Sequence, residues 1–305
     1  MSKQALWGID LGGTKIEGVI LKSENDPEVI LRRRIPTEQS RGYEHIIAQI
    51  GRLVQLMADE SGMQPERIGI GTPGTVDPIL GTHKNSNTTC LNGQPFYNDL
   101  QKALNLSLTM ANDANCFALA EARLGVVKAE MPEAQVVFGV IMGTGVGGGL
   151  VVNGHLLTGR QGIAGEWGHN FLDESGGLSY TGRSGVVETI LSGPALQRYY
   201  TSLCQEERTL QEIYQRYQTG EDEAAKKTIE RLTHYFGLGI SVVINIVDPD
   251  AIVIGGGVGN IDEIYTQGVE SARKFVFNPR LDTRFLKPQL GDSAGVFGAA
   301  MLVAG

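Results

Sequence analysis

Two glycine-rich turns that carry hydroxyl side chains are the part of this chain best suited to chemistry. The first spans residues 10–15, Asp-Leu-Gly-Gly-Thr-Lys, and the second spans residues 143–149, Gly-Thr-Gly-Val-Gly-Gly-Gly. Each directly follows an apolar run. Glycine lets backbone N–H groups approach an anion closely, and such turns form anion-binding nests. Two of them predict a polyphosphate bound from two sides, and hence a phosphotransferase that acts on a nucleotide.

The side chains of these turns support this interpretation. Thr14 and Thr144 supply hydroxyl donors, Lys15 can counter phosphate charge, and Asp10 can hold a hydrated Mg²⁺. Neither turn is a Walker A loop, because Gly-x-x-x-x-Gly-Lys-Ser/Thr is absent. A glycine-rich β-hairpin without a ligand is the alternative for either turn alone. The functional interpretation therefore depends on the residues described next.

Further polar residues fit sugar phosphorylation. Asp113 lies in Asn-Asp-Ala-Asn, residues 112–115, between an expected strand and an expected helix. It could be a helix N-cap, or a general base that takes a proton from a substrate hydroxyl. Glu166 and His169 lie three residues apart between glycines, and Glu188 follows. Carboxylates with Asn and His suit vicinal sugar hydroxyls, although capping or surface positions are the alternative.

The elements that must position these residues alternate between strands and helices, so we expect an α/β fold. Apolar patterns predict three strands within residues 5–35, and others at 68–71, 106–110 and 251–254. Helices are expected at 43–60, 95–105, 117–124 and 222–247, and Thr209 and Glu212 have the spacing of a capping box. At residue 136 the pattern of strand, glycine turn and strand begins again, which suggests two domains with the same opening hairpin.

Composition narrows the class of protein. The chain has 305 residues, 41% of them hydrophobic, which is enough for two domains. A net charge of −8 argues against a nucleic-acid partner, and the basic run at residues 32–34 is expected to be a solvated face. Cys90, Cys116 and Cys204 are scattered without metal-binding spacing, as in a reducing cytosol. With no signal-peptide pattern or membrane-spanning run, we expect a soluble, cytoplasmic protein without a membrane partner.

Five motifs in order resemble the ROK family of sugar kinases and repressors. They are the motifs at residues 10–15, 112–115, 143–149 and 165–169 (Gly-Glu-x-Gly-His), and a late Gly-Gly-Gly at 255–257. The resemblance runs from about Asp10 to Gly298. It implies a two-domain actin-like ATPase (ribonuclease H-like) fold with the active site in the interdomain cleft. The small domain would be 1–115 plus 290–305, and the large domain 116–289.

The resemblance also implies a role for each candidate residue. Asp113 would be the catalytic base, and Asp10 would hold Mg²⁺ through water. The sugar would be bound by Gly71, Asn87, Asn112, Glu166, His169 and Glu188. The phosphates of ATP would be bound by Asp10, Gly12, Gly13, Thr14, Lys15, Thr144 and Gly145, and adenosine would lie near Gly256, Gly257 and Val258. The expected partners are a small-molecule hexose and, as in most of the family, a second copy in a homodimer.

One stretch departs from the family pattern. Most members bind a structural zinc with a histidine and the three cysteines of Cys-x-Cys-Gly-x-x-Gly-Cys-x-Glu. With Glu188 fixing the register, the cysteine positions hold Ser179, Thr181 and Val186. Hydroxyls and an isopropyl group cannot replace thiolates on zinc, so we expect no structural zinc. Without zinc, the sequence does not fix how His169 and Glu188 are oriented.

Within the family, residues 84–96 and Trp167 resemble the manno-fructokinase branch. That branch is expected to have a Trp where this chain has Cys90, and the smaller side chain would enlarge or reshape one wall of the sugar site. We therefore expect an ATP-dependent kinase that phosphorylates the 6-hydroxyl of fructose, mannose or glucose, with fructose ahead. The alternatives are an N-acetylhexosamine kinase, a sugar-sensing repressor, or a sugar-binding module without turnover. Family repressors carry a helix-turn-helix before the first turn, and Asp10 lies too near the start to leave room for one. Polyphosphate as the donor stays open.

Overall fold

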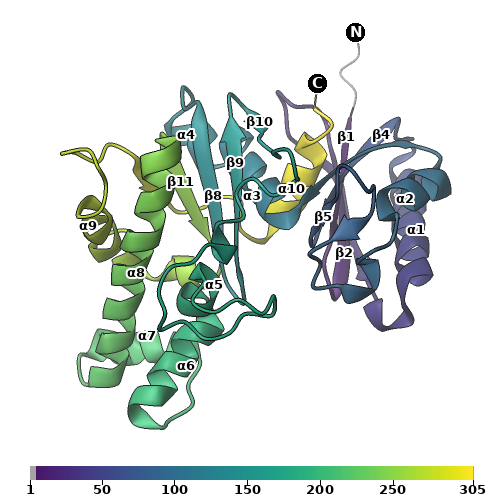
Figure 1. The fold of residues 1–305 in the computed structure, drawn as a ribbon. Coiled ribbons are helices and arrows are strands. Elements are labelled where there is room, and N and C mark those ends of the chain that lie inside the picture. Colours follow the sequence, from purple (N-terminus) through teal and green to yellow (C-terminus); the bar gives the residue numbers. More distant parts are fainter. Residues whose placement is uncertain (1–4, 305) are drawn as a thin grey trace. The chain divides into compact units, whose positions relative to one another are not determined.

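The computed structural model describes residues 5–304, and its internal contacts group the chain into two compact units (Figure 1). Unit 1 comprises Met1–Ala129, Gly154–Ala164 and Leu290–Gly305, and unit 2 comprises Glu130–Asn153 and Gly165–Gln289. Unlike the expected division at residue 115, this grouping keeps residues 116–129 and 154–164 with unit 1. The domain boundaries themselves stay a prediction.

Unit 1 is built on a five-stranded sheet in the order β3-β2-β1-β4-β7. Strand β1 is antiparallel to β2 and parallel to β4, which is parallel to β7. The strands are β1 (Leu6–Leu11), β2 (Lys15–Leu21), β3 (Val29–Pro36), β4 (Arg67–Thr72) and β7 (Ser107–Asn112). The shorter strands of this unit are β5 (Thr75–Val76), β6 (His83–Lys84) and β10 (His155–Leu156).

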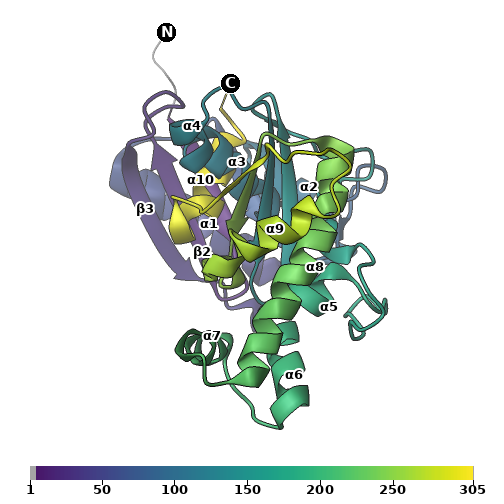
Figure 2. The same cartoon turned by 90° about the vertical axis from the view of Figure 1, so that its left-hand side faces the viewer.

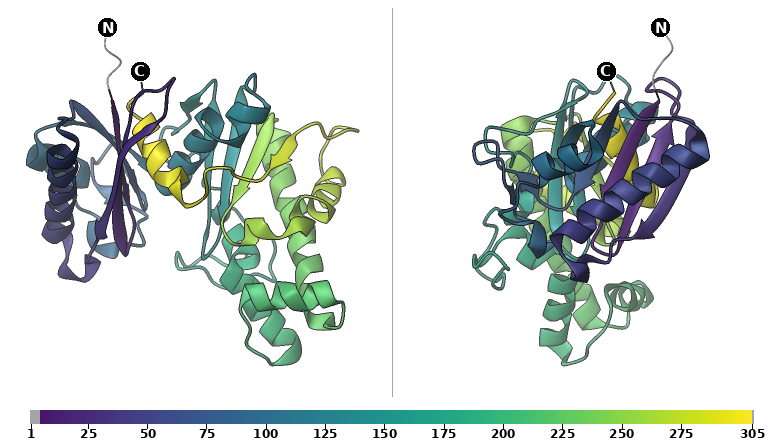
Figure 3. Two further views of the ribbon diagram at one scale, coloured as in Figure 1. Left: turned by 180° about the vertical axis from the view of Figure 1, so that it is seen from behind. Right: turned by 90° about the vertical axis from the view of Figure 1, so that its right-hand side faces the viewer.

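Helices cover both faces of this sheet, and Figure 3 shows α1 running diagonally across one of them. Met57 of α1 packs on that face beside Gly18 of β2. On the other face, α10 lies so close that a Cβ on Gly69 of β4 would be 1.8 Å from the carbonyl oxygen of Ala299, so only glycine fits there. The helices are α1 (Tyr43–Ser61), α2 (Phe96–Leu104), α3 (Asp113–Arg123), α4 (Val126–Glu130) and α10 (Ala294–Met301).

The basic run at residues 32–34 is an ion-paired strand face rather than a freely solvated one. Arg32 and Arg34 both bind the carboxylate of Glu17, the latter at 2.8 Å, and Arg33 points the other way to Glu60. The Glu17 side chain is only 1% exposed. The two arginines therefore compensate a buried charge on β2, which a sequence pattern of three arginines cannot reveal.

Unit 2 repeats the sheet topology of unit 1. Its strands run in the order β9-β8-β11-β12, with β8 antiparallel to β9 and parallel to β11. This matches the arrangement of β1 with β2 and β4, and so confirms the internal echo expected at residue 136. The strands are β8 (Val136–Met142), β9 (Val146–Val152), β11 (Ala251–Gly255) and β12 (Arg284–Leu286).

Five helices complete unit 2, and Figure 2 shows the long α8 beside α9. Phe236 and Ile240 of α8 are fully buried in one core with Phe138 and Val140 of β8. The expected capping box is present, with Thr209 as the N-cap of α7. The helices are α5 (Val187–Leu191), α6 (Gly193–Cys204), α7 (Leu210–Thr219), α8 (Glu223–Val247) and α9 (Gln267–Arg273). Among residues 5–304, no helix combines the length and apolar character needed to cross a membrane.

Candidate active site

The first glycine turn joins β1 to β2 and is held in place by Thr37. The N–H of Gly12 donates to the carbonyl of Lys15 at 2.9 Å, which closes the turn. The Thr37 hydroxyl donates to the Gly12 carbonyl at 2.6 Å, and the Thr37 N–H donates to the Thr14 carbonyl at 3.0 Å. Thr37 is fully buried. The sequence alone does not reveal this role of Thr37, because only the pairing of β2 with β3 brings the residue to the turn.

Asp10 is the penultimate residue of β1, and its carboxylate lies beside two glycines of other elements. It is in register with Gly71 of the neighbouring parallel strand β4. A Cβ on Gly71 would be 3.3 Å from Asp10 Oδ1, and a Cβ on Gly295 would be 3.0 Å from Oδ2. The two glycines therefore leave room around both carboxylate oxygens.

The electrostatics of Asp10 suit a cation. The pKa of Asp10 is raised to about 7, first by burial and then by the negative charges of Asp113 and Glu17, while Lys15 lowers it in part. A divalent cation would relieve this repulsion and favour the ionised form. Mg²⁺ usually keeps several water ligands and needs few carboxylates, so the single side chain of Asp10 fits it.

Asp113 lies at the start of α3, and Asn112 rather than Asp113 provides the helix cap. The Asn112 side chain accepts a hydrogen bond from the N–H of Asn115 at 2.7 Å. Asp113 Oδ1 accepts from the N–H of Ala114 at 2.8 Å. Burial raises the pKa of Asp113, and the backbone N–H groups of Ala114 and Asp113 lower it in part. The residue as a whole nevertheless keeps an exposed surface, and the raised pKa makes its carboxylate a better proton acceptor.

Asn87 lies in a loop whose path is fixed by its neighbours. The Asn92 side chain accepts from the Ser86 N–H and donates to the Ser86 carbonyl, both at 2.9 Å. Behind this clamp, a Cβ on Gly74 would be 2.4 Å from the carbonyl oxygen of Lys84. Asn87 itself is exposed, and sequence analysis did not anticipate the role of Asn92.

In unit 2, the second glycine turn joins β8 to β9 and is bound by Glu188 of α5. Glu188 Oε2 accepts a hydrogen bond from the Val146 N–H at 3.0 Å. A Cβ on Gly145 would be 2.6 Å from the same oxygen. The Gly143 N–H donates to the Gly145 carbonyl at 2.9 Å. The structure thus joins a residue expected at the sugar, Glu188, to a turn expected at the phosphates, and Thr144 lies in that turn.

The late glycines lie beside the same turn. Gly256 has a φ of +83° and follows β11. A Cβ on it would be 2.3 Å from the carbonyl oxygen of Met142, the last residue of β8. Gly257 is the N-cap of a short 3-10 helix, Val258–Asn260, whose first residue Val258 is fully buried. The residues expected near adenosine are therefore held against the start of the second turn.

Glu166 is the N-cap and His169 the last residue of a short 3-10 helix, Trp167–His169, in unit 2. Glu166 Oε2 is 3.9 Å from His169 Nε2. Tyr180, which sequence analysis did not single out, has its hydroxyl 3.4 Å from the same nitrogen. Burial raises the pKa of Tyr180, and Glu188 and Glu166 raise it further, so these carboxylates lie near the phenol. The structure thus brings four polar side chains together.

The amino-acid sequence matches the model of the ROK family over residues 6–305. The chain belongs to the ROK family. It is 34% identical over 307 residues to an N-acetyl-D-glucosamine kinase of Pasteurella multocida (strain Pm70), covering 97% of this chain and 98% of that protein. An N-acetyl-D-glucosamine kinase of Pectobacterium atrosepticum is 33% identical over 315 residues, with the same coverage.

Solved structures of the ROK family have the same fold. A ROK hexokinase from Thermus thermophilus superposes with a TM-score of 0.85 at 28% identity, covering 98% of this chain and 97% of that one. A ROK glucokinase from Streptomyces griseus, in complex with glucose and AMPPNP, has a TM-score of 0.77 at 27% identity, covering 98% and 99%. The chain therefore has the two-domain actin-like ATPase fold of these enzymes and is an ATP-dependent sugar kinase.

The ROK zinc motif does not fit a metal in this chain. The hydroxyls of Ser179 and Thr181 hydrogen-bond to each other at 2.7 Å, and Val186 is buried and pairs with Phe171 through the backbone. Within residues 5–304, no cluster of three or more His, Cys, Asp or Glu side chains could hold a metal ion. The donors at these positions are neutral hydroxyls and a hydrocarbon, which zinc does not select. The absence of structural zinc stays a prediction, which the direct hydroxyl pair supports.

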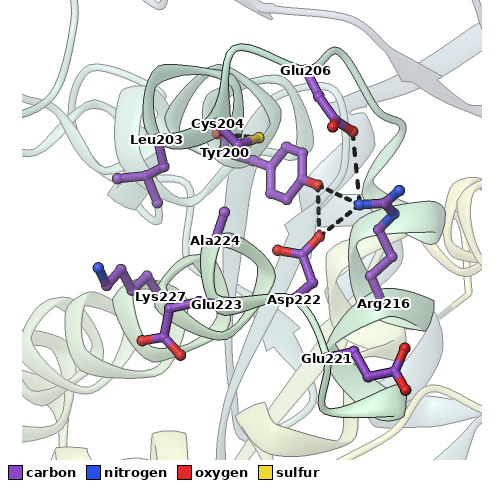
Figure 4. A pocket seen from close by; sticks show the side chains of 10 residues that line it. All are labelled: Tyr200, Leu203, Cys204, Glu206, Arg216, Glu221, Asp222, Glu223, Ala224 and Lys227. Atoms are coloured by element: carbon purple, nitrogen blue, oxygen red, sulfur yellow. Dashed lines mark hydrogen bonds and ion pairs between the residues drawn. The ribbon is translucent and has the colours of Figure 1, made fainter.

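A hollow of about 400 Å³ among α6, α7 and α8 is lined by none of the expected site residues (Figure 4). Asp222 accepts from the Tyr200 hydroxyl at 2.7 Å and from Arg216 at 2.9 Å, and caps α8 by accepting from the Ala225 N–H at 2.9 Å. These central polar groups bind one another, so we assign this part of the ROK chain a structural role in joining the three helices.

Proposed function

We propose that this protein transfers the γ-phosphoryl group of ATP to the 6-hydroxyl of N-acetyl-D-glucosamine or a closely related N-acetylhexosamine. The observation that carries the substrate class is the similarity to N-acetyl-D-glucosamine kinases over 97% of this chain. This similarity favours an N-acetylhexosamine kinase over the fructose-preferring kinase expected from the sequence. No relative described above is a fructokinase.

Two residues bear on the resemblance to the manno-fructokinase branch: Trp167, which matches that branch, and Cys90, which departs from it, and both pack in or against a hydrophobic core. Trp167 is 3% exposed, and its Nε1 donates to the Gly239 carbonyl at 3.1 Å. Cys90 packs against the hydrophobic core of unit 1. Side chains that contribute to a core report packing and ancestry rather than a sugar contact, so they do not select fructose.

In the proposed reaction, Asp113 accepts the proton of the sugar 6-hydroxyl. The sugar oxygen then bonds to the γ-phosphorus as the bond from that phosphorus to the bridging oxygen of ADP breaks. Phosphoryl transfer needs mainly positioning and charge neutralisation, so one base with well-placed donors is sufficient. Mg²⁺, held by Asp10 through water, would neutralise phosphate charge.

The remaining roles follow the two glycine turns and the polar side chains near them. We assign the phosphates to the turn residues Gly12, Gly13, Thr14, Lys15, Thr144 and Gly145. We assign adenosine to Gly256, Gly257 and Val258, and the sugar to Gly71, Asn87, Asn112, Glu166, His169 and Glu188. Gly71, one of the residues assigned to the sugar, is in register with Asp10. Glu188 also accepts a hydrogen bond from the second turn.

The reaction is tested by ³¹P NMR of the protein with ATP, Mg²⁺ and N-acetyl-D-glucosamine. The expected product is a phosphomonoester whose phosphorus couples to the two protons at C6, formed with one ADP per ester. The 6-deoxy sugar is the matched control and should give no ester. Phosphorylation of the 6-deoxy sugar, or ADP formation without any ester, would overturn the proposed reaction.

A further inference from the structure

The loop that replaces the family zinc site closes around Tyr180 by hydrogen bonds. Ser179 and Thr181, the residues on either side of Tyr180, join their hydroxyls at 2.7 Å. The Ser179 N–H donates to the Arg183 carbonyl at 2.8 Å, and the Gly182 N–H donates to the Ser179 carbonyl at 3.0 Å. The loop therefore has a defined conformation without thiolates, and this conformation presents the Tyr180 side chain.

Tyr180 contacts His169 in two ways. Its hydroxyl lies 3.4 Å from His169 Nε2. The two rings meet edge to face, with centroids 5.6 Å apart and planes at 77°. Such aromatic pairs favour a particular orientation beyond the area they bury. Both the hydroxyl and the ring of Tyr180 thus contact the His169 imidazole and restrict its orientation.

The other side of the imidazole offers no such contact. His169 Nδ1 is buried and has no hydrogen-bond partner. In neutral imidazole one nitrogen carries the proton and the other accepts. A proton on Nδ1 would be a buried, unpaired donor, whereas a proton on Nε2 has the Tyr180 hydroxyl as acceptor. The contacts therefore favour the Nε2–H tautomer.

We propose that Tyr180 is a positioning residue that orients the His169 ring and accepts a hydrogen bond from its protonated Nε2, the nitrogen nearest Glu166. In this role Tyr180, held by the Ser179–Thr181 hydroxyl pair, fixes the orientation of the His169 ring, as a bound metal would. The consequence for catalysis rests on the proposed function, in which His169 and Glu166 bind the sugar. Tyr180 would then affect sugar binding and leave ATP binding unchanged.

The tautomer is tested without any activity measurement, by ¹⁵N NMR of histidine-labelled protein at pH 8 in the absence of ligands. In the natural protein His169 should carry its proton on Nε2. In Tyr180→Phe the ring contact is kept but the hydroxyl at 3.4 Å is lost, and Glu166 at 3.9 Å is beyond hydrogen-bonding distance. Water would then replace the Tyr180 hydroxyl as the acceptor from Nε2–H, so the Nε2 signal should shift, while Nδ1, still buried and unpaired, stays without the proton. A proton on Nδ1 in the natural protein, or an unchanged spectrum in Tyr180→Phe, would overturn the proposal.

Kinetics test the consequence for the sugar. Loss of one hydrogen bond should raise the sugar KM of Tyr180→Phe by about 3- to 10-fold, with kcat and the KM for ATP within about twofold. Leu178→Ala is the matched control, since Leu178 is 72% exposed in the same loop and pairs with Ser184 through its backbone. It should behave like the natural protein. An equal rise in both variants would contradict a specific role for Tyr180.

Thr181→Val tests whether the hydroxyl pair acts through Tyr180. It keeps the shape of the side chain and should raise the sugar KM less than Tyr180→Phe does. The double variant should be no worse than Tyr180→Phe alone, because residues that act through one contact are not additive. If the two increases in sugar KM multiply in the double variant, the hydroxyl pair does not act through Tyr180. If the natural protein phosphorylates no sugar, the proposed function fails, whereas the tautomer assignment is still decided by NMR.

Discussion

The side chain of Asn112 accepts a hydrogen bond from the backbone N–H of Asn115 at 2.7 Å and so caps α3. Asp113, the next residue, is therefore the first residue of the helix and not its cap. This relationship separates the two interpretations that the sequence left open for Asp113. A carboxylate that is not required as the cap can serve as a base.

Asp113→Asn should lower kcat by about 100-fold or more, since it keeps size and hydrogen bonding but removes the proton acceptor. The melting temperature should stay close to that of the natural protein because Asn112 still caps α3. Because burial raises the pKa of Asp113, the natural enzyme should also lose activity in acid at a higher pH than an ordinary aspartate would predict. Steady-state rates and a thermal melt check this. Near-normal turnover in the variant would refute Asp113 as the base.

Asp10→Asn should stabilise the unliganded protein at alkaline pH. The folded pKa of about 7 lies above the unfolded value of about 3.9, so the folded state binds the proton more tightly. Stability from this group is present at low pH and is lost as the pH rises through 7. The variant should exceed the natural protein by about 1–3 kcal/mol at pH 8, and by less at pH 5. Urea unfolding at both pH values measures this, and a gap independent of pH would contradict it.

Glu188→Ala should weaken ATP binding as well as sugar binding. The substitution leaves the buried Val146 N–H without its carboxylate partner in the second glycine turn. An unpaired backbone donor costs about 1–3 kcal/mol, so the KM for ATP should rise by about 10-fold. Glu188→Gln is the control, because its amide oxygen can still accept from Val146, and its KM for ATP should stay nearer normal. If the alanine variant changes only the sugar KM, Glu188 does not support the turn.

The purified protein should contain no stoichiometric zinc. Ser179 and Thr181 hydrogen-bond to each other where the family has thiolates, and structural zinc contributes folding free energy in proteins that bind it. A zinc chelator should therefore leave the melting temperature unchanged, whereas a ROK protein with the cysteine motif, treated in parallel, should be destabilised. Elemental analysis that finds about one zinc per chain would show that the loop binds metal through other donors.

Local patterns in the sequence predicted most elements that carry the site. The apolar runs on either side of residues 10–15 and 143–149 are the hairpins β1-β2 and β8-β9. The helix expected from Phe117 begins at Asp113 instead. Its first turn is polar, and a search for apolar periodicity cannot find a start that depends on the Asn112 cap.

The contacts that hold the site residues could not be predicted in this way. Thr37 reaches the first turn through the pairing of β2 with β3, and Glu188 meets Val146 across 42 residues. Tyr180 meets His169 through a loop whose conformation depends on hydroxyls that a zinc motif would not include. Each of these contacts depends on tertiary packing, which spacing along one sequence does not contain.

The central claim is tested most directly by coupled measurement of ADP release with N-acetyl-D-glucosamine, glucose, mannose and fructose as acceptors, each with saturating ATP and Mg²⁺. We expect sugar-dependent ADP release with the highest kcat/KM for N-acetyl-D-glucosamine. A higher kcat/KM for fructose would contradict the proposed substrate. ADP release that does not depend on any of the four sugars would contradict the assignment as a hexose or N-acetylhexosamine kinase.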